Sequence, residues 1–182
     1  MRRASNDGVP PVAELVAMLE RCARGFDGEP DGKVTELLLD LHRSNSAQWD
    51  LEDATREPEA TDAVVARAKR DIDARNQRRH DLVQELDTVI GSLLPQVATA
   101  PPATETPGMV LDRLSVLVIR IHRTERAGDS SPEYAARIPR LRRQLDDLAG
   151  ALDVLLRDVR AGTRRFLPYE PHKLYGVAAK RR

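Results

Sequence analysis

Five side chains along one predicted helix, over residues 31–55, could do chemistry or bind a ligand. They share a face with preceding leucines and are His42, Asn45, Trp49, Glu52 and Asp53. A buried polar group raises the free energy of the fold unless it has a partner, so the pattern predicts either a wet pocket or a fixed hydrogen-bond network. In an enzyme, His42 would be a general acid or base, and Glu52 or Asp53 a base or a metal ligand.

The next predicted helix, over residues 62–94, carries Asn76 and Arg79 on an otherwise apolar face. Arginine keeps its charge in proteins and has five donors, so an inward-facing Arg79 needs a carboxylate or an anionic ligand. The preferred interpretation is an internal ion pair, with Glu52, Asp53 or Asp112. The alternative is a bound phosphate, carboxylate or sugar, hydrogen-bonded by Asn45 and Asn76. Trp49 would then stack on the ligand, or it simply fills the end of the bundle.

Asp112 and Arg113 lie near the start of the fourth predicted helix. An acidic residue in a first turn is favoured by the helix dipole. The apolar surroundings also allow a buried pairing of Asp112 with Arg79 or Arg43. Ser115 is the serine on the core face of this helix, but no base adjoins it in the sequence. A nucleophilic triad is therefore not predicted.

Two residue pairs could contribute to a metal site. His42 with Asn45, and His122 with Glu125, have i,i+3 spacing, so the side chains of each pair share a helix face. Helical bundles bind metals through such pairs when two hairpins pack antiparallel, usually with Glu-x-x-His order and further carboxylates. Here the order is reversed and one pair lacks a carboxylate. A core histidine satisfied by hydrogen bonds is the preferred interpretation.

Acidic residues suggest a second metal hypothesis. They are Asp50, Glu52, Asp53, Asp81 and Glu85, on two successive predicted helices. Such clusters bind Mg²⁺ in the all-α nucleotide pyrophosphohydrolases, where the metal bridges to substrate phosphates. Arginines flank these carboxylates, so a surface lattice of salt bridges explains them as well. We therefore predict no metal and no cofactor.

Composition excludes several classes of partner. The 182 residues include 29 Lys and Arg and 29 Asp and Glu, so the basic excess of a nucleic-acid-binding protein is absent. No apolar run reaches the ~18–20 residues that span a bilayer, and no hydrophobic signal region follows Met1. Cys22 is the lone cysteine. We expect a cytoplasmic protein that binds neither nucleic acid nor a membrane.

Helical periodicity recurs along the chain and strand signals are absent, which predicts an all-α fold. The expected helices cover about 11–23, 31–55, 62–94 and 107–127, with a last one from about 131 that Pro139 kinks or restarts. Thr61 and Thr106 are expected N-caps. Two hairpins joined by a Pro/Ala/Thr-rich crossover over 95–107 predict a four-helix bundle with an additional short N-terminal helix. We expect a single domain over 1–182, with a disordered stretch over 1–10 and a C-terminal extension over 166–182.

Two helices have distinctive apolar patterns. The fourth is apolar all round, which predicts burial at the centre. The last has a 3,4 alternation typical of a bundle or coiled-coil seam, made of Ile138, Leu141, Leu145, Leu148, Leu152, Leu155 and Val159. Either helix could also provide an apolar face for a homodimer.

Several motifs together resemble an uncharacterised bacterial family, domain of unknown function 4254. They are Leu41-His42-Arg43-Ser44-Asn45, Trp49, Glu52-Asp53, Asn76 to Leu82, Thr106-Pro107-Gly108, Asp112 to Ser115, Arg164-Arg165-Phe166 and Lys173-Leu174-Tyr175. The resemblance implies an all-helical cytoplasmic protein encoded near genes for glycosyltransferases and for glycans of the surface or of secondary metabolites. It implies no catalytic role. The chain departs from the family at His80, where Asn is expected, and at His122, where an aromatic residue, usually Tyr, is expected.

Three functions are consistent with these observations. The first is a small-molecule binding or accessory protein of a glycan or glycosylated-metabolite pathway, whose pocket holds an anionic or sugar-like ligand. Its ligand-binding residues would be His42, Asn45, Trp49, Asn76, Arg79, Asp112 and Arg113. The second is an enzyme on a phosphorylated or nucleotide-sugar substrate, with His42 as acid or base. The third is a structural dimerisation module with no ligand, in which Arg79 is fully paired.

Overall fold

The computed structural model describes residues 8–26, 28–57 and 61–168. Its helices are α1 (Val12–Ala23), α2 (Lys33–Ala54), α3 (Asp62–Leu93), α4 (Pro107–Gly128), α5 (Pro132–Ala135) and α6 (Ile138–Arg160). Extended pairing within these ranges is limited to an isolated bridge between Pro102 and Arg165. The all-α prediction is confirmed.

Threonine N-caps begin α3, which contains Arg79, and α4, which contains Arg113. Thr61 Oγ1 accepts a hydrogen bond from the N–H of Val64 at 3.4 Å, and Thr106 Oγ1 accepts one from Met109 at 3.2 Å. Pro107 lies in the first turn of α4, where its missing N–H would have no intrahelical partner. Both expected N-caps are therefore present.

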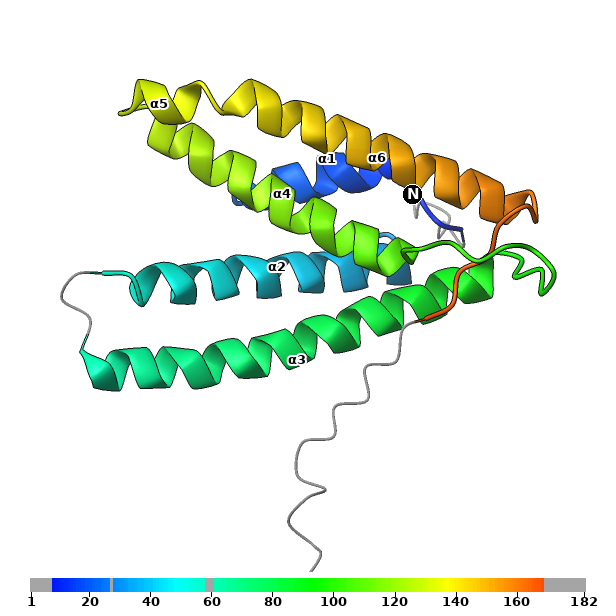
Figure 1. The fold of residues 1–182 in the computed structure, drawn as a ribbon, viewed down its shortest axis with the longest axis horizontal. Helices are drawn as coiled ribbons and strands as arrows, with labels where there is room; N and C mark the ends of the chain where they lie inside the picture. The colour runs from blue at the N-terminus through cyan, green and yellow to red at the C-terminus, as the bar shows by residue number, and fades with distance from the viewer. Residues whose placement is uncertain (1–7, 27, 58–60, 169–182) are drawn as a thin grey trace, which may run out of the picture.

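The central helix is α4 (Figure 1). It packs against α1, α2, α3, α5 and α6, and it lies between α3 and α6. Its buried apolar residues are Val110, Leu111, Leu114, Leu117, Val118, Ile119 and Ile121. Most of its apolar side chains are thus in the core, so the expected burial of the most apolar helix is confirmed, while Arg113 and Arg120 remain exposed.

Both predicted hairpins are present, α2 with α3 and α4 with α6, but the expected four-helix bundle is not confirmed. The hairpins meet through α4, which contacts both α2 and α3. The short α1 packs on α2, α4 and α6, so it fills space between the hairpins. Helix packing is thus centred on α4, and α3 and α6 stand on either side of it.

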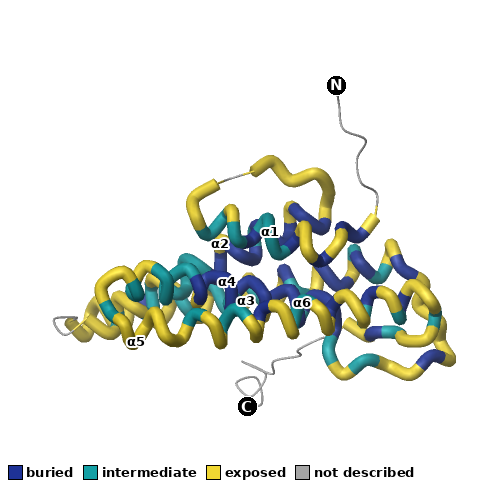
Figure 2. Tube along the Cα trace, turned by 90° about the horizontal axis from the view of Figure 1, so that it is seen from above, coloured by how far each residue is buried: buried dark blue, intermediate teal, exposed yellow. Residues whose placement is uncertain are grey.

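The seam of α6 faces this core. Leu145, Leu152 and Val159 are buried, whereas Leu148 and Leu155 are half-buried. Pro139 lies in the first turn of α6, which begins anew after α5. Figure 2 shows that buried segments gather in the middle of the molecule, while the end that carries α5 is exposed or half-buried. The seam therefore packs within a single chain.

The segments that flank the helices also join the core. Val9 and Pro10 are buried, and the Val9 carbonyl accepts a hydrogen bond from Arg160 at 3.3 Å. The expected disorder over residues 1–10 is thus corrected for these two, because apolar Val9 is part of the core; residues 1–7 lie outside the described ranges. Phe166 is also buried, and its N–H donates to Gln96 Oε1 at 3.1 Å. This contact ties the C-terminal segment to the 95–107 crossover.

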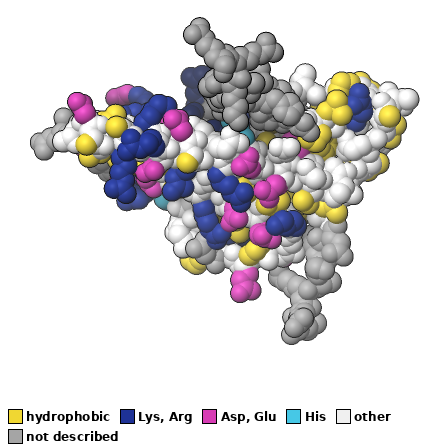
Figure 3. All heavy atoms as spheres, turned by 90° about the horizontal axis from the view of Figure 1, so that it is seen from below, with side chains coloured by type: hydrophobic (Ala, Val, Ile, Leu, Met, Phe, Trp, Pro, Cys, Tyr) yellow, Lys and Arg dark blue, Asp and Glu magenta, His cyan; other side chains and the backbone are white. Residues whose placement is uncertain are grey.

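The surface carries both signs of charge. On the face seen in Figure 3, acidic and basic side chains lie next to one another. Basic side chains gather at the end of the molecule where α2 ends and α3 begins. Exposed ion pairs on α3 include Lys69–Asp73 at 3.0 Å and Arg78–Glu85 at 3.3 Å. No helix in the described ranges is long and apolar enough to cross a membrane.

Candidate functional site

Four buried polar side chains of α2 and α4 form one hydrogen-bond network. His42 Nδ1 lies 3.0 Å from Ser115 Oγ. Asn45 Nδ2 donates to Ser115 Oγ at 3.1 Å and to Asp112 Oδ1 at 2.9 Å. The four residues are between 0% and 7% exposed. We call His42, Asn45, Asp112 and Ser115 the buried network.

Helical spacing explains why these four side chains meet. His42 and Asn45 are three residues apart on α2, and Asp112 and Ser115 are three apart on α4, so each pair shares a face. The contact between α2 and α4 brings the two faces together. The α2 pair therefore meets Asp112 and Ser115, at the start of α4.

Arg79 of α3 extends this network to a third helix. Its Nε donates to both oxygens of Asp112, at 2.8 Å and 2.9 Å, and Nη2 also donates to Oδ2. The Asp112 side chain is 10% exposed and that of Arg79 33% exposed. The hydrogen bond to Asp112 raises the pKa of Arg79 further, against the effect of burial. The predicted internal ion pair is therefore present, and Asp112 is the carboxylate.

His42 is held neutral by its surroundings. Burial above all, with the positive charge of Arg43 and the neighbouring His122, lowers its pKa to about 4. Its Nε2 is buried and has no hydrogen-bond partner in the described part of the chain. Because His42 is 2% exposed, it does not lie at the open cleft expected of a general acid or base, and its Nδ1 contacts a hydroxyl where a base would contact a carboxylate.

A second buried carboxylate fixes the start of α4 against α3. Asp87 Oδ1 accepts a hydrogen bond from the Gly108 N–H at 2.7 Å. Burial raises the pKa of Asp87, whereas hydrogen bonds from Thr106 and Gly108 lower it. A Cβ on Gly108 would lie 2.6 Å from the Val83 carbonyl oxygen and 2.8 Å from Asp87 Oδ1. Only glycine fits this close approach, which accounts for the Thr106-Pro107-Gly108 motif.

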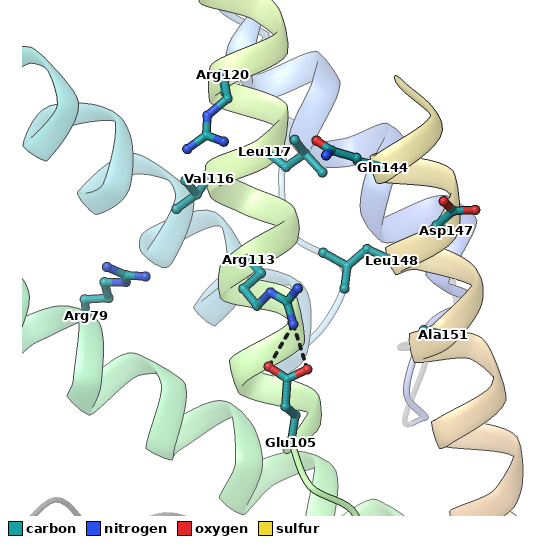
Figure 4. A pocket seen from close by; sticks show the side chains of 10 residues that line it. All are labelled: Arg79, Glu105, Arg113, Val116, Leu117, Arg120, Gln144, Asp147, Leu148 and Ala151. Carbon is teal, nitrogen blue, oxygen red and sulfur yellow. Dashed lines mark hydrogen bonds and ion pairs between the residues drawn. The ribbon is translucent and has the colours of Figure 1, made fainter. Parts of the chain in front are cut away.

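A groove of about 650 Å³ runs over α4 beside Arg79 (Figure 4). Its floor is α4, and α3 and α6 form its sides. We call this cavity the α4 groove; its lining residues are Arg79, Glu105, Arg113, Val116, Leu117, Arg120, Gln144, Asp147, Leu148 and Ala151.

The three arginines of the α4 groove differ in how they are paired. Arg79 reaches from α3 toward α4 (Figure 4), and Asp112 of α4 accepts its hydrogen bonds. Arg113 donates from Nη1 to both oxygens of Glu105, at 2.8 Å and 2.7 Å. Arg120 has no hydrogen-bond or ion-pair partner among the described residues. The groove therefore presents one free guanidinium and two that are partly occupied.

A family model described as a protein of unknown function, DUF4254, matches residues 35–167, which is most of the chain. The chain belongs to the DUF4254 family. No curated protein and no solved structure matches it. The DUF4254 match contains the whole buried network, Arg79 and the entire lining of the α4 groove. Of the motifs that carried the resemblance, Lys173-Leu174-Tyr175 lies outside both the match and the described residues.

The other residues predicted for the site make no hydrogen bond to the buried network in the described ranges, although the charge of Glu52 helps to raise the pKa of Arg79. Trp49 and Asn76 are half-buried, and neither has a side-chain hydrogen bond in the described ranges. Glu52 accepts a hydrogen bond from Gln48 at 3.1 Å, and Asp53 pairs with Arg56 at 3.3 Å. The structure thus brings together His42, Asn45, Arg79 and Asp112, and places Arg113 in the neighbouring groove.

The pairs considered for a metal have other contacts in this DUF4254 chain. Glu125 accepts from Arg142 at 2.6 Å, and Arg142 also contacts Glu20 of α1, so this triad joins α1, α4 and α6. Asp50 pairs with Arg123. In the part of the chain that the structure describes, no three His, Cys, Asp or Glu side chains are grouped to hold a metal ion.

Two residues of the site were missed from the sequence. The sequence predicts no partner for Ser115, because no base adjoins it in the chain, yet His42 reaches it from another helix. The second residue is Asp87, which lies four residues after Val83 on the inward side of α3. An isolated carboxylate among Leu82, Leu86 and Ile90 was a signal that could have found it.

Proposed function

We propose that this protein binds a small anionic ligand in the α4 groove, and that it is a binding or accessory protein. The observation that carries the proposal is Arg120, a guanidinium without a protein partner in the described ranges that lines a groove with Arg79 and Arg113. Arginine is suited to phosphate and carboxylate, because its planar fork donates two parallel hydrogen bonds. The α4 groove offers a ligand the free guanidinium of Arg120 and the donors of Arg79 and Arg113 that Asp112 and Glu105 leave unused.

Charge favours an anion over a cation. The lining contains three arginines against two carboxylates, Glu105 and Asp147. Glu105 faces Arg113, and Asp147 lies on the α6 side of the groove (Figure 4). Because Asp112 pairs with Arg79 and Glu105 pairs with Arg113, the positive charge left without a partner among the described residues is that of Arg120, on the opposite side of the groove from Asp147.

The remaining lining fits a ligand with a sugar-like part. Val116, Leu117, Leu148 and Ala151 supply apolar surface, and Gln144 adds an amide that can donate and accept hydrogen bonds. Ligand sites usually combine such apolar surface with a few polar groups that orient the ligand. A sugar phosphate has an apolar ring face, hydroxyl groups and a charged group, which matches this combination.

The buried network supports the site from behind. Asp112 holds Arg79, Asn45 orients Asp112, and Ser115 connects Asn45 to His42. Binding groups act best when packing and hydrogen bonds already fix their rotamers. In this proposal His42, Asn45 and Asp112 position Arg79, and they do not themselves touch the ligand.

Family membership is compatible with this function. A role in a glycan or glycosylated-metabolite pathway, which the resemblance implied, would supply ligands of this chemistry. The alternative of acid–base catalysis by His42 has less support, because His42 is buried and its pKa is lowered to about 4.

The proposal is tested by calorimetric titration with glucose 1-phosphate, with glucose as the uncharged control. We expect the wild-type protein to bind the phosphate and not the neutral sugar. Arg120→Ala should weaken binding about tenfold or more, since a charged hydrogen-bonding partner is lost. The matched control is Arg70→Ala, which removes an exposed arginine of α3 that does not line the groove. Equal losses in both variants, or no binding by the wild type, would refute the proposal.

A further inference from the structure

Two hollows meet at the same three residues. The α4 groove, of about 650 Å³, is one of them. The other has a volume of about 320 Å³ and lies between α3 and α4 at the start of α4. Arg79, Glu105 and Arg113 line both. We call these three residues the junction, because a ligand group held there has space on each side.

The junction already accommodates an anion. The Glu105 carboxylate lies against Arg113 Nη1, with both oxygens within 2.8 Å. This pair is open to solvent, since the Arg113 side chain is 54% exposed and that of Glu105 40% exposed. Exposed ion pairs contribute little to stability, so an incoming anion could displace Glu105 at small cost. Asp112, by contrast, is nearly buried and holds Arg79 in place.

The two sides of the junction differ in chemistry. On the α6 side lie Leu148 and Ala151, with Gln144 beside them. The hollow between α3 and α4 is lined by Val83, Met109 and the exposed His80, together with the buried carboxylates of Asp87 and Asp112. A thioether and an aliphatic side chain make favourable contacts with a flat ring, and His80 offers a hydrogen bond or a stacking face. Each side can therefore receive a ring-sized group.

We propose that the ligand is a phosphodiester or diphosphate with a substituent on each side, the chemistry of a nucleotide sugar. This proposal rests on the proposed function and specifies the ligand of the same site. One phosphate group lies at the junction, contacts Arg79 and Arg113, and takes the place of the Glu105 carboxylate, while Arg120 binds the anionic part of the ligand that lies in the α4 groove. One substituent lies on the α6 side, and the other lies between α3 and α4.

The test compares one two-sided probe with two one-sided probes by calorimetric titration. UDP-glucose has a group on each side of its diphosphate, whereas UMP and glucose 1-phosphate each have one group. We expect UDP-glucose to bind at least about tenfold more tightly than either one-sided probe. Glu105→Gln should tighten binding of all three, because it removes the competing charge at Arg113.

Two exposed positions locate the substituents without disturbing the core. Ala151→Gln narrows the α6 side, and His80→Glu places a carboxylate on the α3 side. Each variant should weaken the binding of UDP-glucose and of only one of the two one-sided probes. If Ala151→Gln weakens the binding of one of these probes, His80→Glu should weaken the binding of the other. If a one-sided probe binds as tightly as UDP-glucose, or if both variants weaken binding of the same one-sided probe, the proposal of a ligand with two substituents is refuted. The proposal that the α4 groove binds an anion is then unaffected. If no probe binds the wild type, both proposals fall.

Discussion

Arg79 on α3 donates from Nε to both carboxylate oxygens of Asp112 on α4, at 2.8 Å and 2.9 Å. The same carboxylate accepts a hydrogen bond from Asn45 on α2. One aspartate therefore links the two arms of the first hairpin to the central helix. Because Arg79 also lines the α4 groove, this link gives the groove one arginine of fixed position.

Removing the charge of Asp112 should destabilise the fold. Asp112→Asn leaves Arg79 half-buried without its counter-charge and puts a second amide against Asn45. Losing one partner of a buried pair costs about 3–5 kcal/mol, and the partial exposure of Arg79 reduces this to about 2 kcal/mol. Urea denaturation at pH 7 measures the loss.

Glu105→Gln is the matched control for that variant. It makes the same isosteric change in a carboxylate that faces an arginine, but its pair with Arg113 is exposed. We expect its free energy of unfolding to change by less than about 1 kcal/mol. Equal losses in the two variants would mean that burial does not distinguish the pairs.

Acid should destabilise the protein through His42. Its pKa in the fold is lowered from 6.5 to about 4, so the unfolded chain binds this proton more readily than the folded one. The contribution of neutral His42 is therefore complete above about pH 6.5 and is lost as the pH falls toward 4, up to about 3 kcal/mol. Urea denaturation at pH 7.0, 5.5 and 4.5, at constant ionic strength, measures this decrease in the free energy of unfolding.

His42→Gln isolates this contribution, because glutamine keeps a donor and an acceptor but does not titrate in this range. Asp87 acts in the opposite direction: its pKa is raised in the fold, so acid favours the folded state at that residue. The free energy of unfolding of the wild type should therefore fall relative to that of the variant as the pH drops. Parallel pH profiles would show that His42 titrates normally.

Glycine is required at position 108 and not at position 150. Gly108→Ala would place a Cβ within 2.6 Å of the Val83 carbonyl oxygen, so α4 must shift away from α3, at a cost of about 2 kcal/mol or more. A Cβ on Gly150 meets nothing within 4 Å, and alanine there should stabilise α6 by about 0.5–1 kcal/mol. Thermal unfolding should move the midpoints of the two variants in opposite directions. A common direction of change would contradict this account of the glycines.

Helix positions were predictable because their determinants are local. Thr61 and Thr106 accept hydrogen bonds from backbone N–H groups three residues ahead. Pro139 lies in the first turn of α6, because its ring removes an N–H that has no intrahelical partner there. The arrangement of the helices depends on which faces meet across the chain. The contact of α1 with α2, α4 and α6 was not predictable from the periodicity of any single helix, and it separates the observed packing from a simple four-helix bundle.

The site was predictable only in part, for the same reason. The apolar face around Arg79 predicts that a carboxylate pairs with it, and Asp112, the observed partner, was one of three expected carboxylates. The partnership of His42 with Ser115 joins residues 73 positions apart, so no local spacing reveals it. The α4 groove depends on α3 and α6 lying on either side of α4, which only the packing shows.

The most direct test of the anion site observes its arginines one by one. Nitrogen-15 NMR of the arginine Nε–Hε groups would be recorded while glucose 1-phosphate is added. Anion binding in the α4 groove predicts saturable shifts at Arg113 and Arg120, with Arg70 unchanged as an exposed arginine outside the groove. Resonances that do not move, or equal unsaturated shifts at Arg70 and Arg120, would contradict it.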